Sequence, residues 1–172
     1  MQISTKMSFY SRFIFFFFLL TLTSSVYCTP PDSVLIGYVS KDKIIQNDDY
    51  KWGSEGYNQY KPLWSNHDIE FIKLKKTGLN ITIVMGTWCE DSQNHVPKLL
   101  KILNQVHFPE NQIKIYCVNR EKQITEPTLK SMNINYVPTI LIFKETIEIG
   151  RIVENPIESL EKDLLEIIKK TN

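Results

Sequence analysis

One stretch of the sequence decides the fold: Asn80-Ile81-Thr82-Ile83-Val84-Met85-Gly86-Thr87-Trp88-Cys89-Glu90-Asp91-Ser92. Residues 80–85 are mostly apolar and predict a buried strand. A helix is expected to begin around Trp88 to Glu90 and to run to about Val106. Cys89 therefore stands where a helix begins, and the unpaired amides and positive dipole end there stabilise a nearby anion. Because only the thiolate attacks disulfides well, Cys89 is a candidate catalytic nucleophile.

The elements on either side of this stretch predict the fold class. From Ser65 or Asn66, a helix cap, to the C-terminus the expected order is α-β-α-β-α-β-β-α. The later strands are residues 112–118, 139–143 and 146–153, a short helix starts near residues 125–127, and Asn155-Pro156-Ile157-Glu158 opens the last helix. This order predicts an α/β fold with a central mixed β-sheet flanked by helices on both faces. The apolar positions expected to face the core are Ile69, Ile72 and Leu74 in the first helix and Ile157, Leu160, Leu164 and Ile168 in the last.

A second segment of interest is Tyr136-Val137-Pro138-Thr139. Proline has no amide hydrogen, so a Pro directly before a strand marks the strand's first residue or a tight turn. A peptide bond before proline can also be cis.

Residues 65–172, which are 108 residues (172 − 64), resemble a thioredoxin-family domain. The resemblance rests on Trp88-Cys89 after the strand, on Pro97 eight positions beyond Cys89, and on Val137-Pro138-Thr139 before the hairpin, and Gly150 in the last strand also fits. It implies a thioredoxin-like fold in which Cys89 attacks disulfides and Pro138 is cis. It also implies a substrate groove formed by Trp88, Val137, Pro138 and Thr139.

The sequence departs from the family at the active site. Ser92 stands where the family has its second cysteine, so Cys89-Glu90-Asp91-Ser92 cannot form an internal disulfide. Ile83 stands where the family often has a buried carboxylate that relays protons. Glu90 and Asp91 bring negative charge close to the thiol and oppose the effect of the helix terminus. The active-site loop Thr87, Glu90 and Asp91 has another interpretation, in which Thr87 and Glu90 form an ordinary capping box around an inert Cys89.

The other cysteines and histidines predict no further chemistry. Cys117 alternates in phase with Ile113 and Ile115, which predicts a buried core thiol rather than a resolving partner. His95 lies four residues after Asp91, and a surface pair is expected. No further ligands follow at characteristic spacing, so neither a metal nor a cofactor is expected.

Residues 1–28 have the pattern of a secretory signal peptide. Residues 1–12 carry only positive charge, residues 13–22 are apolar apart from Thr21, and small polar residues follow. The apolar run is roughly half the ~20 residues that span a membrane. Cleavage after Cys28 is favoured, and lipidation of Cys28 is the alternative. We expect export to the periplasm or cell envelope, with membrane attachment only if Cys28 is lipidated or the signal is uncleaved.

Residues 29–64 are expected to form an irregular N-terminal extension with a short strand within Val34 to Val39. Between Asp48 and Trp64 the extension is rich in aromatic residues, which usually pack against a domain; a ligand platform is the alternative. The aromatic side chains are Tyr50, Trp52, Tyr57, Tyr60 and Trp64.

Composition limits the classes of function. The chain has 20 Lys and Arg against 19 Asp and Glu. Without Lys6 and Arg12 the balance is 18 (20 − 2) against 19, which gives no electrostatic reason to expect nucleic-acid binding. The 144 residues (172 − 28) beyond the signal suit one domain.

These features predict an exported protein in thiol–disulfide exchange by a single-cysteine route. Cys89 attacks a protein or small-molecule disulfide, Ser92 hydrogen-bonds the sulfur, and an external thiol reductant completes the cycle. The alternative is a redox-inactive binding module that uses the groove of Trp88, Val137 and Pro138 for a protein or peptide partner.

Overall fold

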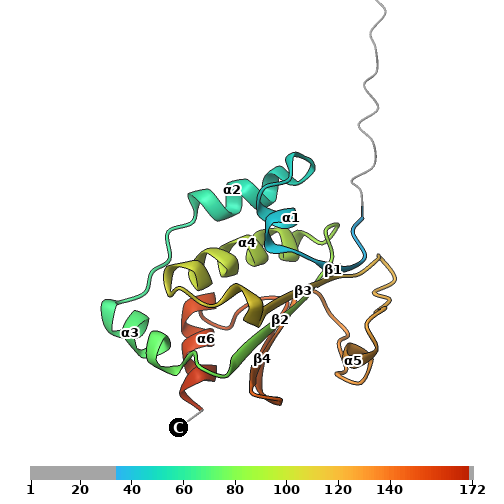
Figure 1. Ribbon diagram of the computed structural model, residues 1–172. Coiled ribbons are helices and arrows are strands. Elements are labelled where there is room, and N and C mark those ends of the chain that lie inside the picture. Colours follow the sequence, from blue (N-terminus) through green and yellow to red (C-terminus); the bar gives the residue numbers. More distant parts are fainter. Residues whose placement is uncertain (1–33, 171–172) are drawn as a thin grey trace, which may run out of the picture. The chain divides into compact units, whose positions relative to one another are not determined.

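The computed structural model describes residues 34–170 (Figure 1). The predicted signal peptide, with its cleavage or lipidation at Cys28, lies outside the described residues. Within residues 34–170, no helix has the length and apolar character needed to cross a membrane.

A mixed five-stranded sheet forms the centre of the structure. Its strand order is β1-β3-β2-β4-β5, with β2 and β3 parallel and the other pairs antiparallel. The elements from residue 66 onward follow the predicted order, with an added 3-10 turn before β3. They are α3 (Asn66–Lys75), β2 (Leu79–Met85), α4 (Glu90–Gln105), the turn Glu110–Gln112, β3 (Ile113–Cys117), α5 (Pro127–Lys130), β4 (Thr139–Lys144), β5 (Ile147–Val153) and α6 (Leu160–Lys169). The α/β class and the thioredoxin-like fold are as the sequence predicts.

The segment before residue 65 is more regular than expected. It forms β1 (Gly37–Val39), α1 (Lys41–Ile45), the 3-10 turn Asp48–Tyr50 and α2 (Lys51–Gln59). Ser40 caps α1 by accepting the amide hydrogen of Lys43. Gly53 permits α2 to touch α1, because a Cβ at this position would lie 1.9 Å from the carbonyl oxygen of Ile44. Polar caps and one close glycine contact therefore order a segment that carries no long apolar stripe.

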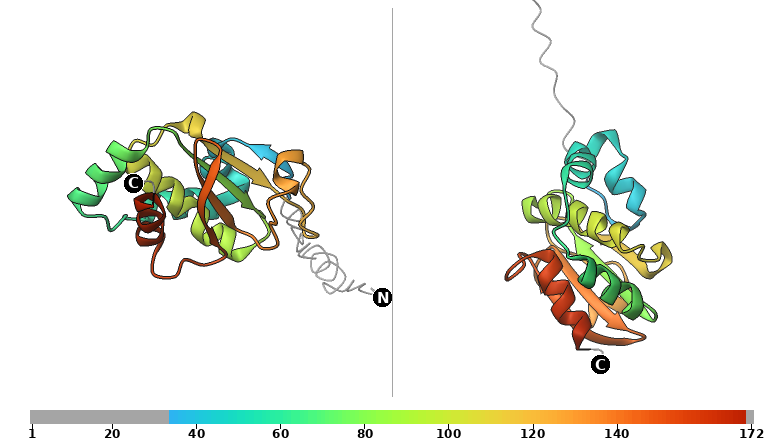
Figure 2. Two further views of the ribbon diagram at one scale, coloured as in Figure 1. Left: turned by 90° about the horizontal axis from the view of Figure 1, so that it is seen from below. Right: turned by 90° about the vertical axis from the view of Figure 1, so that its left-hand side faces the viewer.

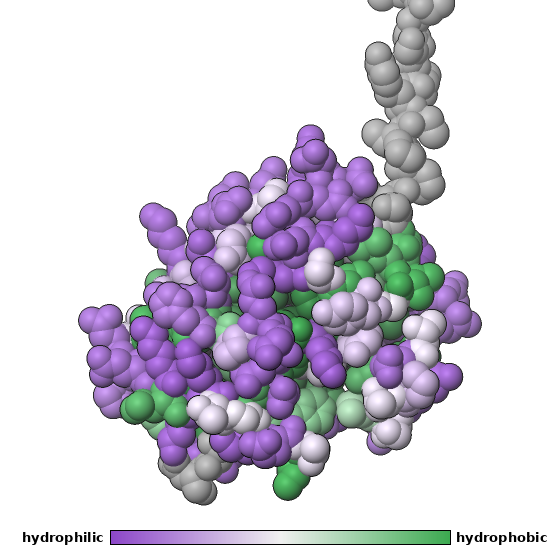
Figure 3. Space-filling view, in the orientation of Figure 1, coloured by the Kyte–Doolittle hydropathy of each residue, from purple (hydrophilic) through white to green (hydrophobic). Residues whose placement is uncertain are grey.

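The described part of this segment joins the rest of the domain. β1 pairs antiparallel with β3, and α2 lies along α4 (Figures 1 and 2). The aromatic residues pack as expected: Tyr50 is buried, and Trp52, Tyr57, Tyr60 and Trp64 lie against the core. Val34 and Ile36 are exposed, and Figure 3 shows hydrophobic surface beside the start of the described chain.

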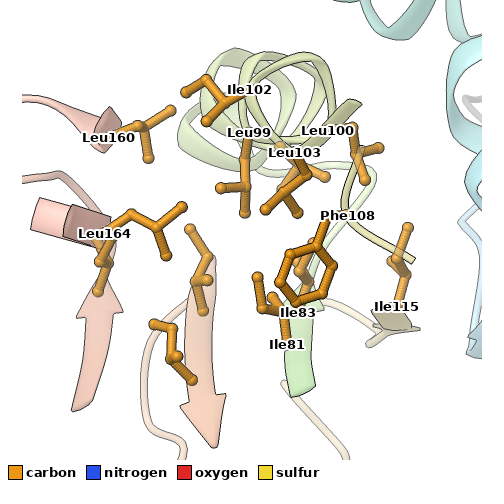
Figure 4. Close-up of a cluster of buried hydrophobic side chains, with 14 of the residues drawn as sticks. Ile81, Ile83, Leu99, Leu100, Ile102, Leu103, Phe108, Ile115, Leu160 and Leu164 are labelled. Carbon is orange, nitrogen blue, oxygen red and sulfur yellow. The ribbon is translucent and has the colours of Figure 1, made fainter. Parts of the chain in front are cut away.

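The two faces of the sheet are covered unequally. Alternate residues of β2, Ile81, Ile83 and Met85, face the larger core beneath α4 and α6. In Figure 4, Leu99 and Leu103 of α4 lie over Ile81 and Ile83, and Leu160 and Leu164 of α6 enter from the side. On the opposite face Val84 and Leu141 contact Leu129 of α5 and the loops around it. Each fully buried large apolar side chain stabilises the fold by about 1.5–3 kcal/mol.

Two of the predicted core positions are wrong, and both lie at helix ends. Leu74 is 80% exposed and Ile157 is 95% exposed. The last helix begins at Leu160 rather than near Pro156, because Ser159 accepts the amide hydrogen of Lys162 and caps the helix there. The carboxylate of Asp163 accepts the amide hydrogen of Ile157, which holds this residue in the preceding turn.

Candidate functional site

Cys89 lies between β2 and α4, as the sequence predicts. The chain leaves β2 at Met85 and makes a turn in which the amide of Cys89 donates to the carbonyl oxygen of Gly86 at 3.0 Å. The amide of Gln93 then donates to the carbonyl oxygen of Cys89 at 3.0 Å, so Cys89 is the N-cap residue of α4. Its side chain is half-buried.

Trp88 is held against this turn. Its indole nitrogen donates to the carbonyl oxygen of Val118 at 3.0 Å. A Cβ at residue 86 would lie 2.6 Å from the indole ring, so the packing of this ring requires Gly86. The indole is therefore fixed directly beside the cysteine.

The register between β2 and β4 brings the second predicted segment to the first. Val84 pairs with Thr139, which places the loop before β4 next to the turn after β2. The Val137–Pro138 peptide bond is cis. The thiol of Cys89 donates to the carbonyl oxygen of Val137 at 3.2 Å. Residues 48 positions apart in the sequence thus meet at the sulfur atom.

The side chains of the predicted groove are placed unevenly. Val137, Pro138 and Thr139 are buried, so the atom that this segment presents to the sulfur is a backbone oxygen. The hydroxyl of Thr139 donates to the carbonyl oxygen of Tyr136 at 2.7 Å and holds the loop. Tyr136, which precedes this segment, is 51% exposed.

Ser92 does not take the position expected of it. Its side chain is fully buried, and its hydroxyl oxygen accepts the amide hydrogen of Gly86 at 3.3 Å. The thiol of Cys89 is instead bonded to Val137. Ser92 therefore stabilises the turn that carries Cys89. The expected hydrogen bond between Ser92 and the sulfur is replaced by the bond from Gly86 to Ser92 and the bond from Cys89 to Val137.

The alternative interpretation, a capping box formed by Thr87 and Glu90, is wrong. The Thr87 side chain is buried, and its hydroxyl oxygen accepts the amide hydrogen of Leu35 at 3.3 Å. Cys89, not Thr87, is the N-cap residue, and it makes no hydrogen bond of the capping type. Glu90 is exposed and Asp91 is half-buried in the first turn of α4. The helix start consequently leaves its first amides without a capping side chain.

Cys117 is a core residue, as predicted. It lies in β3 between Gly37 of β1 and Met85 of β2, and its side chain is almost fully buried. Burial raises the pKa of the Cys117 thiol to about 12. Of the two cysteines in the described part of the chain, Cys89 is the one that solvent reaches.

His95 is buried rather than paired at the surface. A ring nitrogen lies 2.8 Å from the side-chain oxygen of Asn155, so the residue expected to cap the last helix instead joins α4 to the loop before α6. No group of three His, Cys, Asp or Glu side chains within residues 34–170 is arranged to hold a metal ion.

Sequence reasoning missed two basic residues near the site. The guanidinium carbon of Arg120 lies 5.6 Å from the centre of the Trp88 ring, and the ammonium nitrogen of Lys122 lies 5.2 Å from the centre of the Tyr136 ring. Both residues follow β3, and Cys89 follows β2. Because β2 and β3 are parallel, their carboxyl ends meet at one edge of the sheet, so the segments that follow the two strands lie close together.

Comparisons with known proteins find similarity at the level of structure. No protein-family model matches the sequence, and no curated protein matches it either. A thioredoxin from Fasciola hepatica is 19% identical over 60% of this chain and 89% of its own, with a TM-score of 0.39. A protein of unknown function from Pseudomonas aeruginosa is 13% identical over 77% of this chain and 86% of its own, with a TM-score of 0.45. Mitochondrial thioredoxin 3 from Saccharomyces cerevisiae is 20% identical over 59% and 87%, with a TM-score of 0.37. The fold class follows from the strand order and pairing given above.

Proposed function

We propose that this chain is an exported thioredoxin-like protein that carries out thiol–disulfide exchange through the single nucleophile Cys89. The observation that carries the proposal is the position of the thiol. It is half-buried at the start of α4 and lies 3.2 Å from the carbonyl oxygen of Val137, the residue before the cis proline. The indole of Trp88, the residue directly before Cys89, is fixed by its hydrogen bond to the carbonyl oxygen of Val118.

The proposed reaction has two exchange steps. The Cys89 thiol first loses its proton to solvent, and the thiolate attacks one sulfur of a substrate disulfide. A bond forms between Cys89 and that sulfur, the substrate disulfide breaks, and the second substrate sulfur leaves as a thiolate. An external thiolate then attacks the mixed disulfide, forms a new disulfide with the substrate sulfur and releases the Cys89 thiolate.

The need for an external thiol follows from the surroundings of Cys89. Ser92 supplies no second sulfur, and Cys117 is buried within the sheet. Ile83 is fully buried where the family often has a carboxylate, so this position offers no proton relay. These features suit isomerase-like, deglutathionylating or client-holding activity better than net reduction by a dithiol.

The test is the formation of a mixed disulfide, located by peptide mass spectrometry in the full-length chain. With oxidised glutathione, Cys89 is expected to gain one glutathione while Cys117 gains none in the folded state. A Cys89→Ala variant should gain no glutathione within residues 34–170, and Cys89 of a Cys117→Val variant should react as it does in the wild type. A Cys89 that reacts no faster than a free cysteine, and forms no mixed disulfide with glutathione or a peptide disulfide, contradicts the proposal.

Export forms a separate part of the proposal and rests on residues 1–28. Expression in a bacterial host followed by fractionation should give a periplasmic form whose intact mass is that of a chain beginning at Thr29. A form that retains Cys28 with an added lipid mass supports the anchored alternative. A cytosolic form of full mass contradicts export.

A second candidate is a redox-inactive binding module, and exposed apolar side chains beside the site favour it. The hydrogen bond from the amide of Leu35 to the hydroxyl oxygen of Thr87 places the exposed Val34 and Ile36 near the turn that carries Trp88. Titration of the Cys89→Ala variant with a reduced client peptide, followed by tryptophan fluorescence, tests this candidate. Saturable binding together with a wild-type Cys89 that forms no mixed disulfide would favour the module over the enzyme.

A further inference from the structure

Two basic side chains of the loop that follows β3 lie over aromatic rings of the two segments that carry Cys89 and Val137. Arg120 lies over the ring of Trp88, the residue directly before Cys89. Lys122 lies over the ring of Tyr136, the residue directly before Val137. The carbonyl oxygen of Val137 accepts the hydrogen bond from the Cys89 thiol. Arg120 therefore contacts the residue next to Cys89, and Lys122 contacts the residue next to Val137.

The loop that carries these cations is held in place. Its start is bonded to the site twice: the amide of Val118 donates to Met85 at 2.9 Å, and the carbonyl oxygen of Val118 accepts the indole hydrogen of Trp88. The side-chain oxygen of Asn119 accepts the amide hydrogen of Gln123 at 2.8 Å and closes the loop. The ammonium group of Lys122 also donates to the carbonyl oxygen of Asn135 at 3.1 Å. Ordering before binding reduces the entropy that a ligand contact must overcome.

Neither cation is used in an ion pair within residues 34–170. The ion pairs of these residues are Lys41–Glu110, Arg151–Glu148, Lys162–Glu158 and Lys169–Glu166. Both Arg120 and Lys122 are exposed. A contact with an aromatic ring occupies one side of a guanidinium group and leaves its N–H donors free for an anion.

Acidic residues occur on both chain segments near the site. Glu90 and Asp91 are in the first turn of α4, on the other chain segment that borders Cys89, and Glu121 is exposed between the two cations in sequence. The start of α4 therefore carries two acidic side chains and no basic one, whereas the loop after β3 carries Arg120 and Lys122 with Glu121 between them in sequence. Such a charge distribution orients a substrate that carries charge next to its disulfide.

We propose that Arg120 and Lys122 form a carboxylate-binding subsite that selects disulfides bearing a carboxylate close to the reacting sulfur. This inference rests on the proposed function of Cys89. Arginine donates two parallel hydrogen bonds to a carboxylate, and lysine adds a second positive charge. A carboxylate of this kind occurs both in glutathione disulfide and in an acidic segment of a protein client, and the experiment separates the two sources.

The test compares the rates at which Cys89 reacts with three small disulfides of different charge. These are glutathione disulfide, which is anionic, hydroxyethyl disulfide, which is neutral, and cystamine, which is cationic. Each rate is divided by that of a free cysteine derivative with the same disulfide. The variants are Arg120→Gln, Lys122→Gln and their combination. Lys73→Gln is the matched control, because it removes the same charge from an exposed position in α3.

The wild type is expected to favour the anionic disulfide, and this preference should weaken at high salt. The combined variant should lose the preference by roughly tenfold while the rate with the neutral disulfide stays within about twofold, because two exposed charge contacts are removed. The Lys73→Gln control should behave as the wild type does. Comparison of an acidic peptide disulfide with its amide counterpart identifies the source: equal rates indicate the small molecule, and a faster acidic peptide indicates a protein client.

Two other results have separate meanings. An equal loss of rate with all three disulfides assigns Arg120 and Lys122 a structural role and overturns the subsite, as does an unchanged charge preference. A wild-type chain that reacts with none of the three disulfides overturns the proposed exchange activity itself.

Discussion

Replacement of Ser92 by cysteine is expected to convert the single-cysteine site into one that closes an internal disulfide. Ser92 is the third residue of α4 and Cys89 is its N-cap. Residues three apart on a helix have Cβ atoms about 5–6 Å apart. A disulfide needs Cα atoms within about 4.4–6.8 Å and Cβ atoms within about 3.5–4.5 Å, so a modest adjustment of the first turn suffices.

The stability change can be estimated from the same geometry. In the chain-entropy model a disulfide that closes a loop of four residues stabilises the folded state by about 2 kcal/mol. The hydroxyl of Ser92 accepts the Gly86 amide hydrogen at 3.3 Å, and a thiol is a weaker acceptor, which costs about 1 kcal/mol. The oxidised Ser92→Cys variant should therefore be about 1 kcal/mol more stable than the wild type, and the reduced variant about 1 kcal/mol less stable.

The functional consequence concerns release of the client. Because residue 92 is fully buried, the new thiol is shielded from external disulfides and has only a mixed disulfide at Cys89 within its reach. It should expel the client as a thiol and leave a disulfide between residues 89 and 92. Mixed disulfide should thus accumulate on the wild type and disappear from the variant, while the intact mass of the variant falls by the two hydrogens lost on oxidation.

The control is the double variant Cys89→Ala with Ser92→Cys, which should form neither product. A Ser92→Cys variant in which the thiols of residues 89 and 92 both stay free in an oxidising glutathione buffer would refute the assigned geometry. A mixed disulfide that persists on the variant would refute the assumption that residue 92 reaches the Cys89 sulfur.

Three further predictions concern stability. Tyr60→Phe removes the hydroxyl that donates to the buried Glu161 carboxylate at 2.7 Å, and urea denaturation should show a free energy of unfolding lower by about 1.5–3 kcal/mol. Burial raises the Cys117 pKa from 9.0 to about 12, so its thiol contributes stability that is full below pH 9.0 and is lost as pH rises through about 12. The wild type should lose about 1.4 kcal/mol more than Cys117→Val between about pH 8 and about pH 10, and equal losses would contradict this. Gly150→Ala places a Cβ 2.9 Å from the Ile167 side chain and should lower the melting temperature through an overpacking cost of about 1–3 kcal/mol, which a second change, Ile167→Val, should partly relieve.

Local sequence patterns predicted a helix or strand correctly where burial or side-chain capping alone determines it. The apolar run of β2 and the capping signal at Ser65 both gave the correct element, because burial and side-chain capping act over a few residues. The helix α2 was missed because its sequence holds two glycines and no apolar stripe, and its order depends on contact with α1 and α4. Ile157 was assigned to the core because its spacing continues the stripe of α6, although Ser159 begins the helix after it.

The candidate site was predictable in part, because the sequence identifies its residues but not the contacts that strand pairing creates. The resemblance pointed to Cys89 and Val137, whereas their contact depends on the register of β2 and β4, which sequence spacing does not determine. Thr87 fitted a capping box in sequence, yet its hydroxyl bonds to Leu35, 52 positions away. Arg120 was overlooked because its relevance depends on the ring of Trp88 being fixed at the edge where β2 and β3 end.

The single cysteine and the basic subsite constrain each other. In the proposed cycle neither Ser92 nor Cys117 can expel a client, so the mixed disulfide would last until an external thiol reaches Cys89. In the proposed subsite, Arg120 and Lys122 lie over Trp88 and Tyr136 and would act both on the disulfide that enters and on the thiol that ends the cycle. A thiol with a carboxylate near its sulfur would bind the same two cations as the substrate disulfide does. A reductant without one gains nothing from the subsite, and a site of this kind therefore couples the choice of substrate to the choice of reductant.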